Sequence, residues 1–311
     1  MKRVLLTGAT GFIGRHCLVP LRARRDFEVH AVARGERHPD AEGVVWHQAD
    51  LLDPQQVSRL LARVAPSHLL HLAWYAEPGR YWTHPDNLRW LQASLHLLLE
   101  FATHRGERVV MAGTCAEYDW RFGYCSESVT PLSPATLYGT CKRALQVTLD
   151  AYGASSGLSS AWGRIFFVFG PHEHPARLVP SVITSLLRGE HARCSHGNQI
   201  RDFLYVRDAA DAFVALLESQ VTGAVNIGSG EPVTLKSIVM RIAERLGRAE
   251  LVRLGALPSP ASEPPLLLAD VTRLREEVGW RPNYSLDAGL DLTLQWWERQ
   301  LAGSAQVQMC G

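Results

Sequence analysis

A tyrosine and a lysine lie four positions apart in the stretch YGTCK, as Tyr138 and Lys142. If this stretch is helical, both side chains lie on one face of the helix. A phenol is a poor acid near neutral pH because its pKa is about 10, and a nearby ammonium group lowers that pKa by stabilising the phenolate. The pair therefore predicts general acid–base chemistry. The alternative is an exposed helical lysine beside a half-buried tyrosine.

The amino-terminal stretch VLLTGATGFIG places Gly8, Gly11 and Gly14 directly after an apolar strand pattern. Glycines at this spacing let the backbone turn tightly and bring main-chain N–H groups and a helix N-terminus close to a pyrophosphate. We therefore expect a dinucleotide-binding loop. A glycine-rich turn that binds nothing is the alternative.

The second strand pattern ends in the letters VAR, where NAD sites usually carry an acidic residue that accepts hydrogen bonds from the adenosine ribose. Ala33 lacks that acceptor, and Arg34 offers a guanidinium that pairs well with a 2′-phosphate. Arg15 and Arg37 add positive charge. The pattern favours NADP(H), with NAD(H) still possible. Asp50, at the end of the third strand pattern, is expected to accept a hydrogen bond from the adenine amino group.

Strand and helix patterns alternate through the first half of the chain. We expect strands over residues 4–7, 28–33, 44–47, 69–73, 109–112 and 160–169, and helices over 12–25, 54–64, 86–104 and from Ser133-Pro134 to about Gly153. This alternation implies a parallel sheet covered by helices on both faces, a Rossmann-like doubly wound α/β fold.

The pattern becomes irregular after residue 170. We expect a dinucleotide-binding Rossmann domain over residues 1–169, with parts of 201–230 returning to it. Residues 170–200 and 231–311 are expected to form a smaller C-terminal α/β lobe that binds the substrate.

The composition narrows the class of protein. The chain has 311 residues and a formal net charge of +1, which argues against a nucleic-acid-binding protein that depends on a strong positive field. Six scattered cysteines without a C-x-x-C pair are typical of reduced thiols in the cytosol. No apolar run is long enough to span a membrane, and the basic start is a poor signal peptide. We expect a cytoplasmic protein.

The stretch PHEHP, with His172, Glu173 and His174, has no third metal ligand nearby. It predicts a surface turn, and we expect no metal site.

Together these motifs resemble the NAD-dependent epimerase/dehydratase family, extended short-chain dehydrogenases/reductases that act on nucleotide sugars. The matching stretches are TGATGFIG, ADL, HLAW, GTCAEY, YGTCK, GRIFFVFGP, RDFLYVRDAADA, VNIGSG and LREEVGWRPNYSLDAGL, in family order from residue 5 to about residue 297. The resemblance implies an NAD(P)-dependent oxidoreductase. It also implies a catalytic triad of Thr114, Tyr138 and Lys142, because the family places a Ser or Thr four residues before a tyrosine that is here Tyr118.

The resemblance further implies a cofactor site built from the glycine loop and the ends of neighbouring strands. Its expected residues are Gly8, Thr10, Gly11, Phe12, Ile13, Gly14, Arg15, Arg34, Asp50, Leu51, Leu72, Ala73, Trp74, Tyr138, Lys142 and Phe166.

The two positions after Thr114 distinguish reactions within the family. Its 4,6-dehydratases carry Asp-Glu there as acid and base, and its decarboxylases carry a glutamate at the second position. This chain has Cys115-Ala116, and alanine can do neither task. We expect Cys115 to be a small buried thiol rather than a proton carrier. Glu117, one step further, is expected to point to the opposite side, in structural pairing or at the pocket rim.

What remains is hydride chemistry at a carbinol or ketone. We expect NADPH-dependent reduction at C4 of a nucleotide-linked 4-keto-6-deoxyhexose in deoxysugar biosynthesis. The alternative is a nucleotide-sugar 4-epimerase that uses a retained NAD. A 4,6-dehydratase is less favoured, as is a non-catalytic NADP-binding regulator, because such regulators usually lack the Tyr-Lys pair.

The same resemblance implies a nucleotide-sugar pocket. Arg201 in RDFLYV matches the family position that contacts the diphosphate, and Arg177 is placed to reach it too. Phe167 replaces an asparagine of many relatives. An apolar wall for a deoxygenated sugar is expected from Trp74, Tyr75, Tyr81, Trp82 and Trp120, with ordinary core packing as the alternative. The expected substrate contacts are Tyr75, Trp82, Thr114, Cys115, Ala116, Phe167, Arg177 and Arg201.

Relatives pair two helices, which correspond here to residues 86–104 and to the helix that carries Tyr138, across a two-fold axis. The resemblance therefore implies a homodimer. Leu145 and Leu149 are expected on the second of these helices, away from the side that carries Tyr138.

Overall fold

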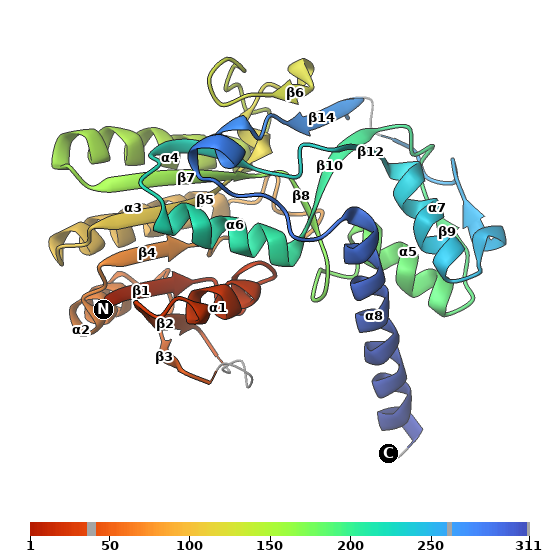
Figure 1. Ribbon diagram of the computed structural model, residues 1–311, viewed down its shortest axis with the longest axis horizontal. Helices are drawn as coiled ribbons and strands as arrows, with labels where there is room; N and C mark the ends of the chain where they lie inside the picture. The colour runs from red at the N-terminus through yellow and green to blue at the C-terminus, as the bar shows by residue number, and fades with distance from the viewer. Residues whose placement is uncertain (36–41, 260–262, 310–311) are drawn as a thin grey trace.

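The computed structural model describes residues 1–35, 42–259 and 263–309. Arg37 lies outside these ranges. The described residues form a large parallel sheet of seven strands (Figure 1). In spatial order these are β11 (Gly223–Ile227), β7 (Ser159–Ile165), β5 (Arg108–Thr114), β4 (His68–His71), β1 (Lys2–Thr7), β2 (Phe27–Ala33) and β3 (Val44–Gln48).

Helices cover both faces of this sheet. One face packs against α2 (Pro54–Val64), α3 (Asp86–Thr103) and α4 (Leu137–Ser156), and the other against α1 (Gly14–Ala23) and α6 (Val206–Glu218). Successive residues of a strand point to opposite faces. Leu5 of β1 accordingly belongs to one apolar cluster, and Val4 and Leu6 belong to the other. The predicted doubly wound fold is confirmed.

A second layer of structure lies at one end of the large sheet. A smaller sheet runs in the order β12 (Pro232–Thr234), β10 (Ile200–Tyr205), β14 (Leu266–Ala269) and β6 (Tyr124–Cys125), and β8 (Phe167–Phe169) pairs with β10. A third apolar cluster lies among α5 (Leu178–Leu187), α7 (Leu235–Arg245) and α8 (Leu286–Met309), beside the β9 (Ala192–Arg193) and β13 (Val252–Arg253) pair. Figure 1 shows α5, α7 and α8 on the side away from α2 and α3.

The described residues also form four short helical turns: η1 (Cys115–Glu117), η2 (Trp120–Phe122), η3 (Ala249–Leu251) and η4 (Arg273–Glu277). No helix in the described ranges is both long and apolar enough to cross a bilayer.

A buried carboxylate joins the two sheets. Asp202 of β10 is fully buried and accepts hydrogen bonds from the backbone N–H groups of Ser229, at 2.6 Å, and Gly230, at 2.9 Å. It also accepts one from the N–H of Ala269 at 3.2 Å. The smaller sheet is therefore tied to the turn that follows β11. The division of the chain into two functional lobes stays a prediction.

The structure corrects two predicted boundaries. The helix that carries Tyr138 begins at Leu137 rather than at Ser133-Pro134, because the Thr136 side chain provides the N-cap by accepting from Gly139 N. The strand predicted over 160–169 is two strands. β7 ends at Ile165, where its partners β5 and β11 also end, and the chain passes at Phe166 into the smaller sheet.

Gly163 in the middle of β7 lets α6 approach the sheet closely. A Cβ there would lie 2.4 Å from Cε1 of Phe213. We expect Gly163→Ala to lower the free energy of unfolding by about 1–3 kcal/mol through overpacking, measured by urea denaturation. The control is Gly303→Ala in α8, where a Cβ meets no atom within 4 Å and stability should hold or rise slightly. Equal stability of Gly163→Ala and the parent would contradict this packing.

Candidate functional site

The predicted catalytic residues meet at the carboxyl end of β5. Thr114 ends this strand and forms a hydrogen bond with Tyr138. Lys142, one helical turn after Tyr138, donates from Nζ to the Ala112 carbonyl at 2.8 Å. Helix α4 approaches this closely because residue 139 is glycine, since a Cβ there would lie 2.4 Å from the Ala116 carbonyl oxygen. Sequence spacing alone placed Tyr138 and Lys142 together, and the fold brings Thr114 to them.

Burial controls the protonation of the Tyr-Lys pair. Burial and the neighbouring Tyr81 raise the pKa of Tyr138, and the hydrogen bond with Thr114 opposes them. The expectation that Lys142 lowers this pKa is wrong for this geometry, because burial dominates and the ammonium group is bound elsewhere. It lies 3.8 Å from the centroid of the Trp74 ring besides its bond to Ala112. Burial also lowers the pKa of Lys142 to about 7, and Glu117 opposes that shift.

Aromatic rings surround Tyr138, as the predicted wall requires. Its ring centroid lies 4.9 Å from that of Tyr81, 5.9 Å from that of Trp82 and 6.5 Å from that of Trp74. Trp120 extends the wall, at 6.0 Å from Trp82. Tyr75 instead packs on His84, with centroids 4.5 Å apart. Four of the five predicted aromatic residues therefore gather at Tyr138.

The glycine loop is packed too tightly for side chains at two of its glycines. A Cβ on Gly14 would lie 2.1 Å from the Gly8 carbonyl oxygen. A Cβ on Gly8, whose φ is +70°, would lie 2.8 Å from Ala73 N. The loop thus rests directly on the Leu72–Ala73 segment after β4, and α1 begins at Gly14. This is the cradle that a pyrophosphate needs, with a helix N-terminus facing it, so the residues present fit a dinucleotide.

The other predicted cofactor residues lie around this loop. Ala33 is buried and Arg34 is exposed at the end of β2, next to the half-buried Asp50 and the buried Leu51 that follow β3. Arg15 is held on the glycine loop by the carbonyl of Thr10 at 2.7 Å and by that of Gly11 at 3.3 Å. Its guanidinium is therefore committed to the loop. Phe12 and Ile13 pack against the third apolar cluster, and Phe166 is buried where the chain changes sheets.

The two predicted phosphate-binding arginines differ in their surroundings. Arg201 is buried, donates to Oε1 of Glu263 at 3.0 Å and lies 5.5 Å from the ring centroid of Phe167. Arg177 is exposed, with its guanidinium 5.6 Å from the ring centroid of Tyr81. Only Arg177 lies at the aromatic wall and also faces solvent.

The turn PHEHP is at the surface only in part. His172 and His174 are exposed, but Glu173 is 8% exposed. The surface-turn prediction is therefore wrong for this carboxyl. Burial raises its pKa to about 8, and Arg177 opposes the shift. Within the part of the chain that the structure describes, no group of three or more His, Cys, Asp or Glu residues is arranged to hold a metal ion.

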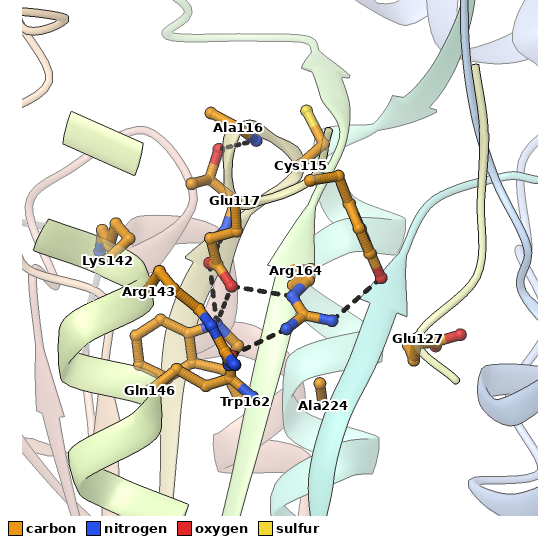
Figure 2. A network of polar contacts seen from close by, with 12 residues as sticks. Cys115, Ala116, Glu117, Glu127, Lys142, Arg143, Gln146, Trp162, Arg164 and Ala224 are labelled. Carbon is orange, nitrogen blue, oxygen red and sulfur yellow. Dashed lines mark hydrogen bonds and ion pairs between the residues drawn. The ribbon is translucent and has the colours of Figure 1, made fainter. Parts of the chain in front are cut away.

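The turn after Thr114 presents no free carboxylate. Cys115 and Ala116 are buried, and Glu117 is fully buried with its carboxylate bound to Trp162 and Arg164 of β7 (Figure 2). Sequence reasoning missed Arg164 and Trp162 as partners of this turn. An available signal was the presence of one acidic and one basic residue inside otherwise apolar strand patterns, since buried charges are normally paired.

Comparison with known proteins agrees with this fold. The model of the NAD dependent epimerase/dehydratase family matches residues 4–228. The chain is 28% identical to UDP-glucuronic acid decarboxylase 1 of Danio rerio, over 99% of this chain and 75% of that protein. It is 27% identical to UDP-glucose 4-epimerase of Rhizobium meliloti (strain 1021), over 96% and 98%. It also superposes on the crystal structure of Thermus thermophilus UDP-glucose 4-epimerase in complex with NAD, with a TM-score of 0.84, 29% identity and coverage of 95% and 99%. The chain therefore belongs to the NAD-dependent epimerase/dehydratase family and is an enzyme of the extended short-chain dehydrogenase/reductase type.

Proposed function

We propose that this enzyme catalyses NADPH-dependent reduction at C4 of a nucleotide-linked 4-keto-6-deoxyhexose. The observation that carries the proposal is the turn after Thr114. Its side chains are a buried thiol, a buried methyl group and one carboxylate, which is bound to Arg164 and Trp162. Elimination of water from a hexose needs an acid and a base at the sugar, and this turn supplies neither. Transfer between a ketone and an alcohol needs only a proton donor at the sugar oxygen.

In this proposal Tyr138 gives its proton to the C4 oxygen, and the Thr114 hydroxyl orients that oxygen. Burial raises the pKa of Tyr138, so the phenol carries its proton at neutral pH. Lys142 would hold the nicotinamide ribose from the same helix face.

A dinucleotide would lie on the glycine loop, with Leu72 and Ala73 beneath it and Arg34 at the adenosine end. Bound there, a nicotinamide cofactor supplies the reducing equivalent. The absent ribose acceptor at Ala33 and the exposed Arg34 support a 2′-phosphate at this end.

The sugar would lie against the aromatic wall. Trp82 and Trp120 offer an apolar surface beside Tyr138, which suits the methyl group of a 6-deoxy sugar better than a hydroxymethyl group or a carboxylate. Arg177, exposed at the rim of this wall, would pair with the diphosphate.

A nucleotide-sugar 4-epimerase with retained NAD is the second candidate. It is favoured by the similarity to two UDP-glucose 4-epimerases, one of them in complex with NAD. It would use the same Tyr138, so only substrate and cofactor measurements separate the two reactions.

Tyr138→Phe keeps the ring and removes the proton. We expect turnover of a nucleotide 4-keto-6-deoxyhexose with NADPH to fall by about 10²–10⁴-fold, the range of a positioned general acid, with little change in nucleotide-sugar affinity by calorimetry. Thr114→Val should reduce turnover less, because it removes an orienting hydrogen bond. Near-parent turnover in Tyr138→Phe would reject the mechanism.

The reaction is tested with dTDP, CDP, UDP and GDP forms of the 4-keto-6-deoxy sugar and NADPH. Parallel incubations contain UDP-glucose alone, dTDP-, UDP- and CDP-glucose with NAD, and UDP-glucuronic acid with NAD. We expect NADPH consumption in the first set and no product in the parallel incubations. Galactose formation would instead support the epimerase, a 4-keto-6-deoxy product a dehydratase, and carbon dioxide release a decarboxylase.

Arg34→Ala should weaken NADPH binding by much more than NADH binding, because only NADPH carries the 2′-phosphate. Calorimetric titration measures both affinities. Arg25→Ala is the matched control, since Arg25 is an exposed arginine near the opposite end of the same strand, which begins at Phe27. Tighter binding of NADH than of NADPH by the parent would contradict the proposed cofactor.

We also propose a homodimer formed through α3 and α4. Leu145 and Leu149 do not contribute, because both are fully buried against the sheet, which corrects their expected placement. Leu88 and Leu99 of α3 and Val147 of α4 are exposed instead.

Val147→Asp should therefore convert the dimer to a monomer in light scattering at micromolar concentration. Val19→Asp on α1, at the other face of the sheet, should leave the dimer intact. A monomeric parent protein would reject this assembly.

A further inference from the structure

Glu117 and Arg164 form an ion pair with almost no access to solvent. The side chain of Glu117 is 0% exposed and that of Arg164 is 1% exposed. The Arg164 Nε donates to Glu117 Oε2 at 2.8 Å, and its other two nitrogens donate to Tyr118 Oη at 3.0 Å and to Gln146 Oε1 at 2.8 Å. Figure 2 shows these side chains meeting between the turn, β7 and α4. A buried pair is tolerated when each of its polar atoms has a hydrogen-bond partner, as here.

The carboxylate also holds the strand end that carries Thr114. Glu117 Oε1 accepts from Thr114 N at 2.8 Å and from Trp162 Nε1 at 2.9 Å. Residue 113 has no room for a side chain, because a Cβ there would lie 2.0 Å from Trp162 Nε1 and 2.6 Å from Glu117 Oε1. The backbone N–H of Thr114 is therefore held by the charged carboxylate of Glu117.

Lys142 holds the same strand end through the carbonyl of Ala112, two residues before Thr114. The last residues of β5 thus lie between the buried ammonium of Lys142 and the buried carboxylate of Glu117. Lys142 is only 4% exposed, so water solvates its charge poorly.

We propose that Glu117 is a positioning residue, whose carboxylate fixes Thr114 and keeps Lys142 in its ammonium form as its buried counter-charge. Arg164 holds that carboxylate in place. The consequence for catalysis rests on the proposed function, whereas the electrostatic link does not.

Among the groups around Lys142, the Glu117 carboxylate is the charge that favours the ammonium form of the lysine. Other titratable and charged groups lie near Glu117 and Lys142. They are His71 of β4, Tyr81 of the loop before α3, Cys115 and Tyr118 of the turn, Tyr138, Arg143 and Asp150 of α4, Arg164 of β7 and, at the far end of the network, Glu127.

Most of these groups carry no negative charge near Lys142. Burial lowers the pKa of His71 to about 3, so its ring is neutral, and burial raises the pKa values of Cys115, Tyr118 and Tyr138, so all three keep their protons. Burial draws the pKa of Lys142 down to about 7, and Glu117 is the group that opposes this. Without it, the lysine should lose its proton at a lower pH.

The experiment is a direct titration of Lys142. The chain has only three lysines, Lys2, Lys142 and Lys236, so protein labelled with [ε-¹³C]lysine gives three carbon signals. Lys142→Met assigns the Lys142 signal by its loss. In Glu117→Gln, we expect the midpoint of the Lys142 signal to fall by about one pH unit or more, the size of a close charge interaction, while Lys2 and Lys236 stay unchanged.

Two further comparisons make the result decisive. Glu127→Gln removes the same charge at the far end of the network, where Glu127 accepts from Asn226 N at 2.7 Å, and should leave the Lys142 midpoint unchanged. If Glu117→Gln does not fold, Glu117→Gln with Arg164→Met is compared with Arg164→Met alone. The Lys142 midpoint should be lower in the double variant, because the two proteins differ only in the Glu117 charge.

The proposal is overturned by a parent-like midpoint in folded Glu117→Gln, by an equal fall in Glu127→Gln, or by equal midpoints in Arg164→Met with and without Glu117→Gln. If the proposed function also holds, the activity of the Glu117 variant is lost at a lower pH as the solution becomes alkaline. The carbon signals need no substrate or cofactor, so they decide the electrostatic link even if the proposed reaction is wrong.

Discussion

The geometry at the carboxyl end of β5 depends on the carboxylate of Glu117, which water cannot reach. Once Glu117 is fully buried, its charge must be matched and its oxygens must be hydrogen bonded, or the fold loses several kcal/mol. The partners that meet this requirement come from β7 and from the backbone of Thr114. Because Arg164 also reaches Tyr118 and Gln146, the same pair orients the turn against β7 and against α4.

Missing side chains are as important as charges in this site. At Gly14 the absence of a Cβ lets α1 begin directly on the loop, and at Gly113 it admits Trp162 and Glu117 to the strand end. At Gly139 it brings the first turn of α4 onto the Ala116 carbonyl. Each contact would be closer than 3 Å with a side chain present, so the close approach of the glycine loop, the turn after Thr114 and α4 requires glycine at all three positions.

The pKa shifts in the site follow from the exclusion of water from it. Burial keeps the proton on Tyr138 and weakens the hold of Lys142 on its own proton, so both effects disfavour the charged forms. The aromatic rings of Trp74, Tyr81 and Trp82 pack around Tyr138 and contribute to its burial. In the proposed function the same rings form the surface that contacts the sugar.

The sequence by itself determined what depends on local spacing. Strand and helix alternation predicted the doubly wound sheet, glycine spacing predicted the loop before α1, and the four-residue interval placed Tyr138 and Lys142 on one helix face. Only the tertiary structure decided what depends on burial and on distant partners. Glu117 finds Arg164 at a separation of 47 residues, and the hydroxyl that caps α4 is Thr136 rather than Ser133. Arg15 turns back onto its own loop, Leu145 and Leu149 face the core, and Tyr138 holds its proton more tightly although Lys142 is near. Periodicity shows which face of an element is apolar, but the desolvation of a charge depends on every chain segment that packs around it, so it becomes defined only when the whole fold is assembled.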